Sequence, residues 1–334
     1  MSLRSDLRSQ LSLPAICAPM FLVSGPEMVA EACKAGIVGA LPRANARELG
    51  QFDAWLMQIA DARARHADQH PGARIGPIAV NLATNLSRDE LRENLAVCKR
   101  HGVQIIISAV GDPTELTKEV HDWGGVIFHD VTALRFAEKA IGAGVDGLTC
   151  IGAGGGGHSG LISHLALVPK VRSMFDGVVL MAGAIGNGAA IRAAEVLGAD
   201  LAYMGTRFIA TREAPVHSSY KQMLVDEACA GLMYTPAISG IPANWMKASM
   251  EANGLDPAAL PVPEKGAKPY AHLPQGVKPW KTLWSAGQGI ELIRDVPNVS
   301  ELVARLRREY VAACETPSLI DAARLVDEVQ SLTE

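Results

Sequence analysis

A short apolar run followed by an amphipathic segment, repeated eight times, is the feature that most constrains this chain of 334 residues. We predict strands at 15–20, 37–41, 75–82, 103–109, 126–129, 147–151, 178–182 and 201–204. Helices are predicted after them at 24–35, 52–65, 87–102, 112–123, 133–141, 165–174, 189–197 and 215–226. The strand runs are mostly continuous, which is typical of parallel strands covered on both faces. Eight such units favour a closed (β/α)₈ TIM barrel, with an open doubly wound sheet as the alternative.

Helix starts are marked by local capping signals. Ser24 and Ser87 each precede a glutamate by three positions, the spacing of a capping box. Pro26 and Pro113 stand near the starts of their helices, where a missing backbone N–H costs nothing. These signals support the helical half of each repeat.

The repeat ends near residue 230. We therefore expect a barrel over 1–229, and over 230–298 a smaller, irregular cap or substrate subdomain rich in Pro, Gly, Lys and Trp. Two further helices are predicted at about 299–314 and 318–332, within a C-terminal segment 299–334. They would pack either on the barrel or on a second copy of the chain, which would make a homodimer.

Composition excludes several classes of function. Apolar residues make up 49 % and charged residues 20 %, so a large core is expected. The net charge of −4 gives no basic field for nucleic acid or an anionic membrane. No run reaches the roughly 18 apolar residues of a membrane span. Six scattered cysteines without a CxxC pair, and a charged N-terminus without a signal region, indicate a cytoplasmic protein with reduced thiols and no metal centre.

Four consecutive glycines, Gly154–Gly157, stand directly before His158. Such a run lets the backbone approach a ligand closely and aim its N–H groups at it. His158 could then serve as a general base or as a hydrogen-bond donor; the alternative is a flexible turn with an incidental histidine. His164 is expected to be structural or exposed, and His129 is a weaker candidate. No helix is predicted to open at the end of the run, so its G-x-G-x-x-G match does not indicate a Rossmann site.

The ends of the predicted strands define the remaining pocket, because barrel sites lie at the carboxyl ends of strands. After the last two strands come Ala182-Gly183-Ala184 and Gly205-Thr206, small residues with free N–H groups suited to a phosphate. Alternatively, these glycines only permit tight turns. Asn81 could likewise be the cap of a turn. The other strand ends supply Ala18-Pro19-Met20, Asn81, Ser108 and Asp130. A flat, hydrogen-bonding cofactor with one phosphate, such as FMN, fits this set.

These residues resemble one family. Ala18-Pro19-Met20, Asn81, the glycine run with His158, Met204-Gly-Thr-Arg-Phe208 and Gly287-Gln-Gly289 are similar to the nitronate monooxygenases, formerly called 2-nitropropane dioxygenases. The resemblance implies a TIM barrel with a smaller substrate domain, bound FMN, and oxidation of alkyl nitronates by O₂. Some relatives instead reduce quinones with NADH, or reduce enoyl thioesters.

Carried over by position, the resemblance makes His158 the catalytic histidine. It places FMN contacts at Ala18, Pro19, Met20, Asn81, Gly156, Ala182, Gly183, Ala184, Gly205 and Thr206, with Asp130, Gly157 and Gln288 as neighbours of the pocket. The chain departs from the family pattern at four places. The segment 21–25 is not the small, glycine-rich stretch of many members, Asp130 stands where some carry Lys, and Ile151 replaces an acidic residue found in some. Gly156 and Gly157 lie in an unusually glycine-rich version of their loop.

The sequence therefore predicts FMN-dependent oxidation of a small alkyl nitronate by O₂ to a carbonyl compound and nitrite. An NAD(P)H-dependent flavin reductase acting on a quinone or an enoyl thioester is the main alternative. A barrel dehydrogenase of the inosine-monophosphate type would need a loop cysteine, and the sequence has none between 151 and 228. A flavin-binding sensor is the non-enzymatic alternative, because fold alone does not fix function.

Overall fold

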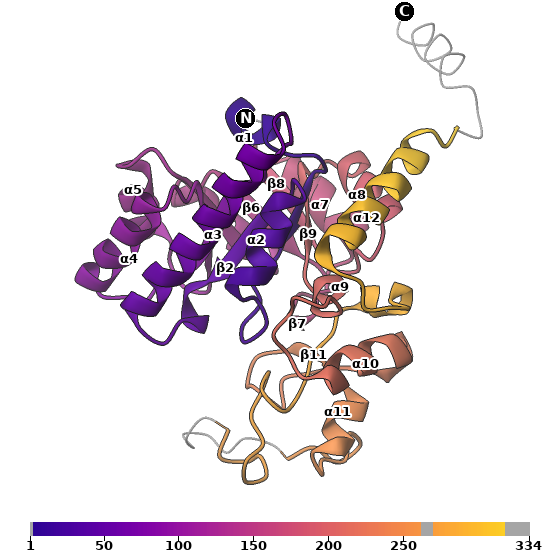
Figure 1. The fold of residues 1–334 in the computed structure, drawn as a ribbon. Helices are drawn as coiled ribbons and strands as arrows, with labels where there is room; N and C mark the ends of the chain where they lie inside the picture. Colours follow the sequence, from indigo (N-terminus) through magenta and orange to yellow (C-terminus); the bar gives the residue numbers. More distant parts are fainter. Residues whose placement is uncertain (1–2, 262–269, 318–334) are drawn as a thin grey trace, which may run out of the picture.

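The computed structural model describes residues 3–261 and 270–317. Its centre is a closed parallel barrel in which the eight strands follow one another in chain order (Figure 1). The strands are β1 (Ala15–Cys17), β2 (Val38–Pro42), β3 (Ile78–Ala83), β4 (Ile105–Ala109), β5 (Val126–Val131), β6 (Gly147–Ile151), β8 (Val178–Ala182) and β9 (Leu201–Met204). The first strand pairs with the last, Ile16 opposite Tyr203, so the sheet closes. The predicted TIM barrel is confirmed and the open sheet is excluded.

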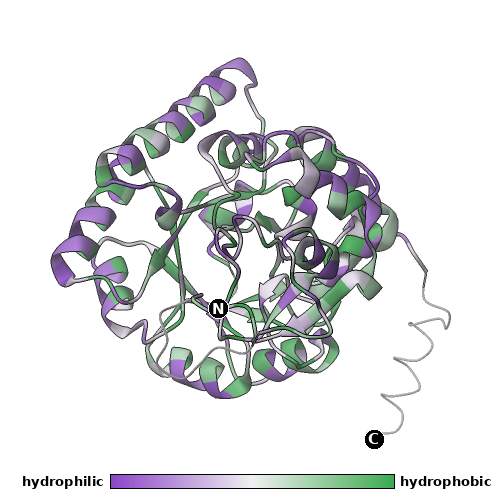
Figure 2. Cartoon of the chain, turned by 90° about the horizontal axis from the view of Figure 1, so that it is seen from below, coloured by the Kyte–Doolittle hydropathy of each residue, from purple (hydrophilic) through white to green (hydrophobic). Residues whose placement is uncertain are grey.

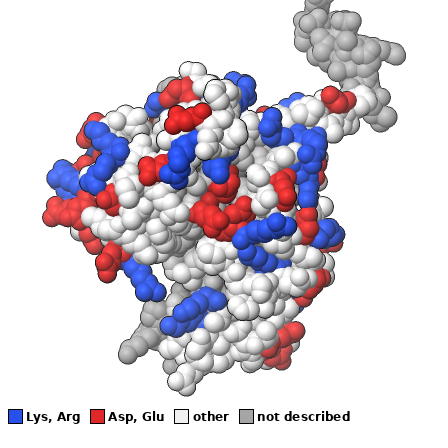
Figure 3. Space-filling view, in the orientation of Figure 1, with Lys and Arg blue, Asp and Glu red and all other residues white. Residues whose placement is uncertain are grey.

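Helices cover the outside of the barrel. Those that follow the strands are α2 (Pro26–Lys34), α3 (Leu49–Gln69), α4 (Arg88–Arg100), α5 (Thr114–His121), α6 (Leu134–Gly142), α7 (His164–Arg172), α8 (Gly188–Val196), α9 (Thr206–Ile209) and α10 (Ser218–Asp226). Seen along the barrel, they ring the sheet (Figure 2). Lys, Arg, Asp and Glu are mixed over their outer surface (Figure 3). Among the described residues, no helix is long and apolar enough to cross a membrane.

Alternate residues of each strand pack on opposite sides of the sheet. Ala15 and Cys17 belong to the apolar layer between sheet and helices, whereas Ile16 points into the barrel interior. At the amino ends of the strands, the short helix α1 (Ser5–Ser9) contributes Leu7 to that interior cluster. The barrel interior is therefore packed with side chains toward the amino ends of the strands.

One capping prediction is right and one is wrong. Ser87 and Glu90 form the predicted capping box at α4. Ser24 does not cap α2, which begins after Gly25 without a side-chain cap. The Ser24 hydroxyl instead accepts from the Met20 N–H at 2.9 Å and donates to the Ala18 carbonyl at 3.2 Å. It folds the loop after β1 back on itself, and this loop carries three predicted cofactor contacts, Ala18, Pro19 and Met20.

The region beyond α10 is more regular than predicted. Two strands, β10 (Leu232–Thr235) and β11 (Ala243–Met246), form an antiparallel sheet with β7 (Gly157–His158), the end of the glycine run. With helix α11 (Lys247–Ala252) they form the lobe below the barrel in Figure 1. A separate apolar cluster fills this lobe: Ile238, Ala243, Trp245, Met250, Leu255, Leu273 and Leu283. No pattern in the sequence predicts β10 and β11, because both are short and the turn between them begins and ends with a proline, Pro236 and Pro242.

Helix α12 (Val299–Cys314) returns to the barrel and packs against α8 and α2. Asn298 and Glu301 form a capping box at its start. A Cβ atom at Gly188 of α8 would come within 2.2 Å of the Leu306 carbonyl, so this glycine allows the two helices to approach closely. The second helix predicted for this segment, at 318–332, lies outside the described residues.

Candidate active site

A cavity of about 1150 Å³ opens at the carboxyl ends of the barrel strands, between the barrel and the lobe that carries β10 and β11. Thirteen of the fourteen predicted site residues line it. They are Ala18, Pro19, Met20, Asn81, Asp130, Gly156, Gly157, His158, Ala182, Gly183, Ala184, Gly205 and Thr206. Sequence positions from 18 to 206 thus converge on one space. Its volume lies slightly above the roughly 300–1,000 Å³ that is usual for a site holding one small ligand.

Gln288 is the predicted site residue that does not line the cavity. Its backbone N–H donates to the Gly154 carbonyl at 2.9 Å, and the same carbonyl accepts from the Ala184 N–H at 3.1 Å. The Gly287 N–H in turn donates to the Thr206 hydroxyl at 2.9 Å. These bonds tie together the loops that follow β6, β8 and β9, so Gln288 supports the wall of the cavity from behind.

Glycine is required where these loops meet. A Cβ atom at Gly183 would lie 2.5 Å from the Gly155 nitrogen, and the φ of +111° at Gly183 disfavours any other residue. A Cβ atom at Gly156 would lie 2.7 Å from the Gly287 nitrogen. The amides of Gly183 and Gly205 make no hydrogen bond within the described part of the chain. The wall is thus a cradle of bare backbone with unused donors, which suits a bound anion.

His158 stands at the end of this cradle, on β7 opposite Ala243. Ser239 donates its single hydroxyl proton to the Ile241 carbonyl at 3.0 Å and therefore meets His158 Nε2, 3.2 Å away, as an acceptor. This arrangement assigns the ring proton to Nε2 and leaves the lone pair on Nδ1. Nδ1 has no partner among the described residues. Burial lowers the pKa of His158, so the ring is neutral near pH 7 and can accept a proton.

The indole of Trp280 fixes the other side of the His158 ring. The two rings meet edge to face with their centroids 5.2 Å apart. Trp280 in turn packs on Trp245, with the centroids 5.0 Å apart. The imidazole is therefore held between a hydroxyl and an aromatic ring, and its orientation is set before any ligand binds.

Asp130 is a carboxyl group that lines the cavity and has an unusually high pKa. It is the second-last residue of β5, and its Oδ1 is buried without a hydrogen-bond partner among the described residues. Burial raises the pKa of Asp130 to about 7. Below that pH the carboxyl is mostly neutral and can donate a hydrogen bond to a ligand. Its neighbour Tyr203 also lines the cavity, and the pKa of that phenol is raised by burial and then by the charge of Asp130.

Three other predicted residues have structural partners. Asn81 lies within β3 and donates to the Ile107 carbonyl at 3.3 Å, so it is not a turn cap. His129 Nδ1 lies 2.8 Å from the Ser108 hydroxyl. His164 is buried, with Nε2 2.6 Å from the Ala182 carbonyl, and it does not line the cavity. His164 thus supports β8, as its structural interpretation predicts.

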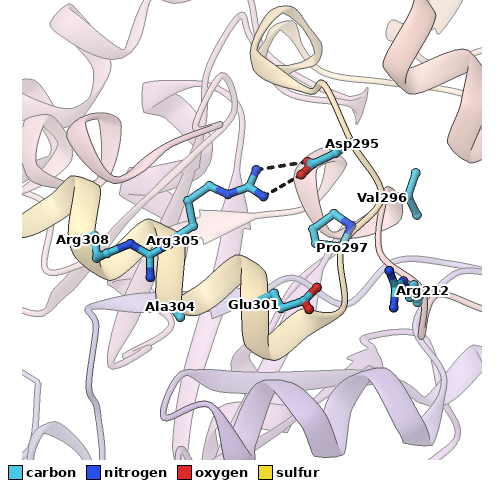
Figure 4. A pocket seen from close by; sticks show the side chains of 8 residues that line it. All are labelled: Arg212, Asp295, Val296, Pro297, Glu301, Ala304, Arg305 and Arg308. Atoms are coloured by element: carbon cyan, nitrogen blue, oxygen red, sulfur yellow. Dashed lines mark hydrogen bonds and ion pairs between the residues drawn. The ribbon is translucent and has the colours of Figure 1, made fainter.

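A second hollow, of about 430 Å³, lies beside the start of α12 (Figure 4). Its two carboxylates and Arg305 are already engaged. Asp295 pairs with Arg305 through two hydrogen bonds, of 2.6 and 3.1 Å, and with the buried Arg207 at 2.8 Å. Glu301 takes part in the capping box of α12. Since Arg207 directly follows Thr206, this cluster anchors the loop after β9 rather than forming a binding site.

Similarity to known proteins places this architecture in a family. A model of the family described as nitronate monooxygenase matches residues 6–309. This chain belongs to that family. Members of the family are flavoproteins, so the chain is an oxidoreductase of a flavin-dependent type. Within the described residues, no group of three His, Cys, Asp or Glu side chains could hold a metal ion.

Individual relatives carry different activities. A nitronate monooxygenase of Paraburkholderia phytofirmans is 29 % identical, over 90 % of this chain and 93 % of that protein. A protein of Rhodococcus jostii, named (3aS,4S,5R,7aS)-5-hydroxy-7a-methyl-1-oxo-octahydro-1H-indene-4-carboxyl-CoA dehydrogenase, is 26 % identical over 92 % of this chain and 81 % of its own. The family model establishes the family, and identities this low do not establish the substrate.

Solved structures share the fold. The nitroalkane oxidase of Streptomyces ansochromogenes superposes with a TM-score of 0.73 at 24 % identity, covering 93 % of this chain and 99 % of that one. FabK of Thermotoga maritima gives 0.69 at 21 % identity, covering 94 % and 98 %. At these identities the similarity to both structures shows the fold alone.

Sequence reasoning missed the residues that hold the glycine run and His158 in place. Asn244 of β11 donates to the Gly155 carbonyl at 2.7 Å and to the Ser159 hydroxyl at 3.2 Å. Ser239 and Asn244 follow their partners by 81 and 89 positions. No local pattern links residues so far apart. The only signal was the clustering of tryptophans in the same segment, which predicts a small apolar centre but no contact.

Proposed function

We propose that this chain binds FMN in the cavity and oxidises alkyl nitronates with O₂ to a carbonyl compound and nitrite. The observation that carries the proposal is the neutral imidazole of His158, oriented by Ser239 and Trp280 at the end of a glycine cradle. Membership of the nitronate monooxygenase family supports the reaction class.

Two features of the cavity fit a flavin mononucleotide. The free N–H groups of Gly183 and Gly205 would hold its phosphate. A Cβ atom at Gly183 would clash with the Gly155 nitrogen and so displace the loops that form this site. The unpartnered Oδ1 of Asp130 would meet a polar edge of the ring system, where a neutral carboxyl can donate a hydrogen bond. A bound flavin would supply the electron acceptor, and the protein supplies position and charge.

The residues of the chain then have separate tasks. His158 Nδ1 takes the α-proton from a neutral nitroalkane and so generates the nitronate within the cavity. Ser239 accepts from Nε2–H and stabilises the charge that the ring gains. Trp280 covers the imidazole and excludes water on that side. A nitronate supplied from solution bypasses the proton transfer.

This division of tasks gives a direct test. His158→Ala should lower turnover of neutral nitroalkanes about 10²–10⁴-fold, the usual worth of a general base, and should lower turnover of preformed nitronates much less. Nitrite release and O₂ consumption are the readouts. His70→Ala, an exposed histidine at the end of α3, is the matched control. Unchanged turnover of neutral nitroalkanes in the His158 variant would remove His158 from the mechanism.

One observation favours a second candidate, an NAD(P)H-dependent flavin reductase acting on a quinone or an enoyl thioester. The Rhodococcus jostii relative is named as a dehydrogenase of a CoA-linked compound and covers nearly the whole chain. Stopped-flow mixing of the oxidised flavoprotein with NADH or NADPH without oxygen separates the two. Rapid bleaching of the flavin supports the reductase, and absence of bleaching supports the nitronate reaction.

A further inference from the structure

The lobe beside the barrel brings to the cavity a hydrogen-bond donor that the proposed chemistry does not use. Trp280 lines the same space as His158 and is half-buried. Its indole N–H makes no hydrogen bond within the described part of the chain, whereas that of Trp284 donates to the Lys281 carbonyl at 3.3 Å. Tryptophan N–H groups that are withdrawn from bulk water usually have a partner. An unpaired one at a cavity therefore indicates a ligand.

Gly157 keeps the space beside this donor open. A Cβ atom at Gly157 would lie 3.7 Å from Trp280 Nε1 and 3.9 Å from the Ser285 hydroxyl oxygen, so a side chain here would enter the space that these two polar atoms border. The φ of +67° at Gly157 also disfavours any other residue. Of the two polar groups, the hydroxyl can donate or accept, whereas the indole can only donate.

The backbone of Trp280 is strained. Its φ of +60° lies in the left-handed region, which bulky side chains avoid. The Trp280 backbone N–H donates to the Leu283 carbonyl at 2.8 Å, and the ring packs on Trp245, which is buried in the apolar centre of the lobe. Strained conformations of this kind are found mainly at functional sites, where the surrounding structure holds them in place. The lobe thus holds the indole against the His158 ring.

The two groups are complementary to one kind of ligand. His158 presents a lone pair on Nδ1, and the indole of Trp280 presents a proton. A nitroalkane carries an acidic C–H group directly beside two oxygens that accept hydrogen bonds, and a nitronate carries the same two oxygens with a negative charge. One acceptor and one obligate donor at the same end of the cavity match this pair.

We propose that the indole N–H of Trp280 donates a hydrogen bond to an oxygen of the substrate's nitro or nitronate group and holds that group while His158 acts on the α-carbon. The inference rests on the proposed function for the identity of the group. It makes Trp280 a residue that determines specificity, because an obligate donor selects ligands that present an acceptor at this end of the cavity.

Trp280→Phe tests the donor, because it removes the N–H and keeps an aromatic ring. The probe is isobutyrate, which has the shape of the nitronate of 2-nitropropane, carries two acceptor oxygens and does not react. Titration calorimetry on the FMN-loaded protein should show its dissociation constant rising about 10- to 100-fold in the variant, the usual loss for a hydrogen bond to a charged group. Trp284→Phe is the matched control, because Trp284 lies outside the cavity lining.

Turnover separates binding of the nitro group from support of His158. Trp280→Phe should lower kcat/KM for preformed nitronates and for neutral nitroalkanes by a similar factor, because both place oxygens against the N–H. A loss confined to neutral nitroalkanes would show that Trp280 acts only by positioning His158, and would overturn the inference.

The remaining outcomes separate the inference from the proposed function. Weaker isobutyrate binding to Trp280→Phe, with binding to Trp284→Phe unchanged, supports the inference even if nitronates are not turned over. Turnover of nitronates by the wild type, with equal isobutyrate binding to Trp280→Phe and wild type, supports the proposed function and overturns the inference. Loss of FMN from Trp280→Phe, with isobutyrate binding unchanged, would assign the indole N–H to the flavin and also overturn it.

Discussion

Replacing Asp130 with asparagine should change how the stability of the apoprotein depends on pH. The Asp130 carboxyl has an unpartnered Oδ1, and burial raises its pKa from 3.8 to about 7. Between these two values the unfolded chain loses the proton while the folded chain keeps it. The folded state therefore binds more protons, and stability falls as pH rises through this window. Above about pH 7 the loss is complete.

The size of the effect follows from the pKa difference of about three units. At 1.36 kcal/mol per unit, the penalty reaches about 4 kcal/mol above pH 7 and is close to zero at pH 4. Asparagine cannot ionise, so Asp130→Asn should be about as stable as the wild type at pH 4 and about 4 kcal/mol more stable at pH 8.

Urea unfolding of the apoprotein at several pH values measures this difference directly. Asp68→Asn, which removes an exposed carboxylate on α3, is the control for the loss of one acidic side chain. A difference between Asp130→Asn and wild type that stays constant from pH 4 to pH 8 would refute the reasoning. It would mean that Asp130 reaches water or a partner in the folded protein.

Two further changes test the support of the cavity. Gly183→Ala should weaken FMN binding about tenfold or more, measured by flavin fluorescence, because its Cβ would meet the Gly155 nitrogen at 2.5 Å. Gly50→Ala on α3, where a Cβ meets nothing within 4 Å and which lies outside the cavity lining, should bind normally. Arg207→Leu should lower the free energy of unfolding by about 1–3 kcal/mol, because it removes hydrogen bonds of a buried cation. Equal urea midpoints for Arg207→Leu and wild type would show that the cluster around Asp295 does not anchor the loop after β9.

The barrel could be predicted because each of its units is specified locally. Continuous apolar runs, capping residues and helix-ending glycines recur with one spacing, and parallel strands joined by helices can close in few ways. The strand-end residues from Ala18 to Thr206 were found for the same reason, since the carboxyl ends of all eight strands meet at one end of the barrel.

The features that the sequence did not predict depend on contacts between segments that are distant in the chain. The helical spacing of Phe136 with Ala137 and Ala140 predicts a buried side chain, yet Phe136 is 38 % exposed and lines the cavity. The sheet that joins β7 to β11 brings together residues more than 80 positions apart. A short strand whose partner lies so far along the chain leaves no periodic pattern in the sequence.

The most direct measurement is the visible absorption spectrum of the purified protein, followed by chromatography of the cofactor released on denaturation. The account predicts a yellow protein that releases FMN, and Gly183→Ala should be purified with much less of it. A colourless protein that does not take up added FMN, or one that releases FAD, would contradict a cradle built for a single phosphate.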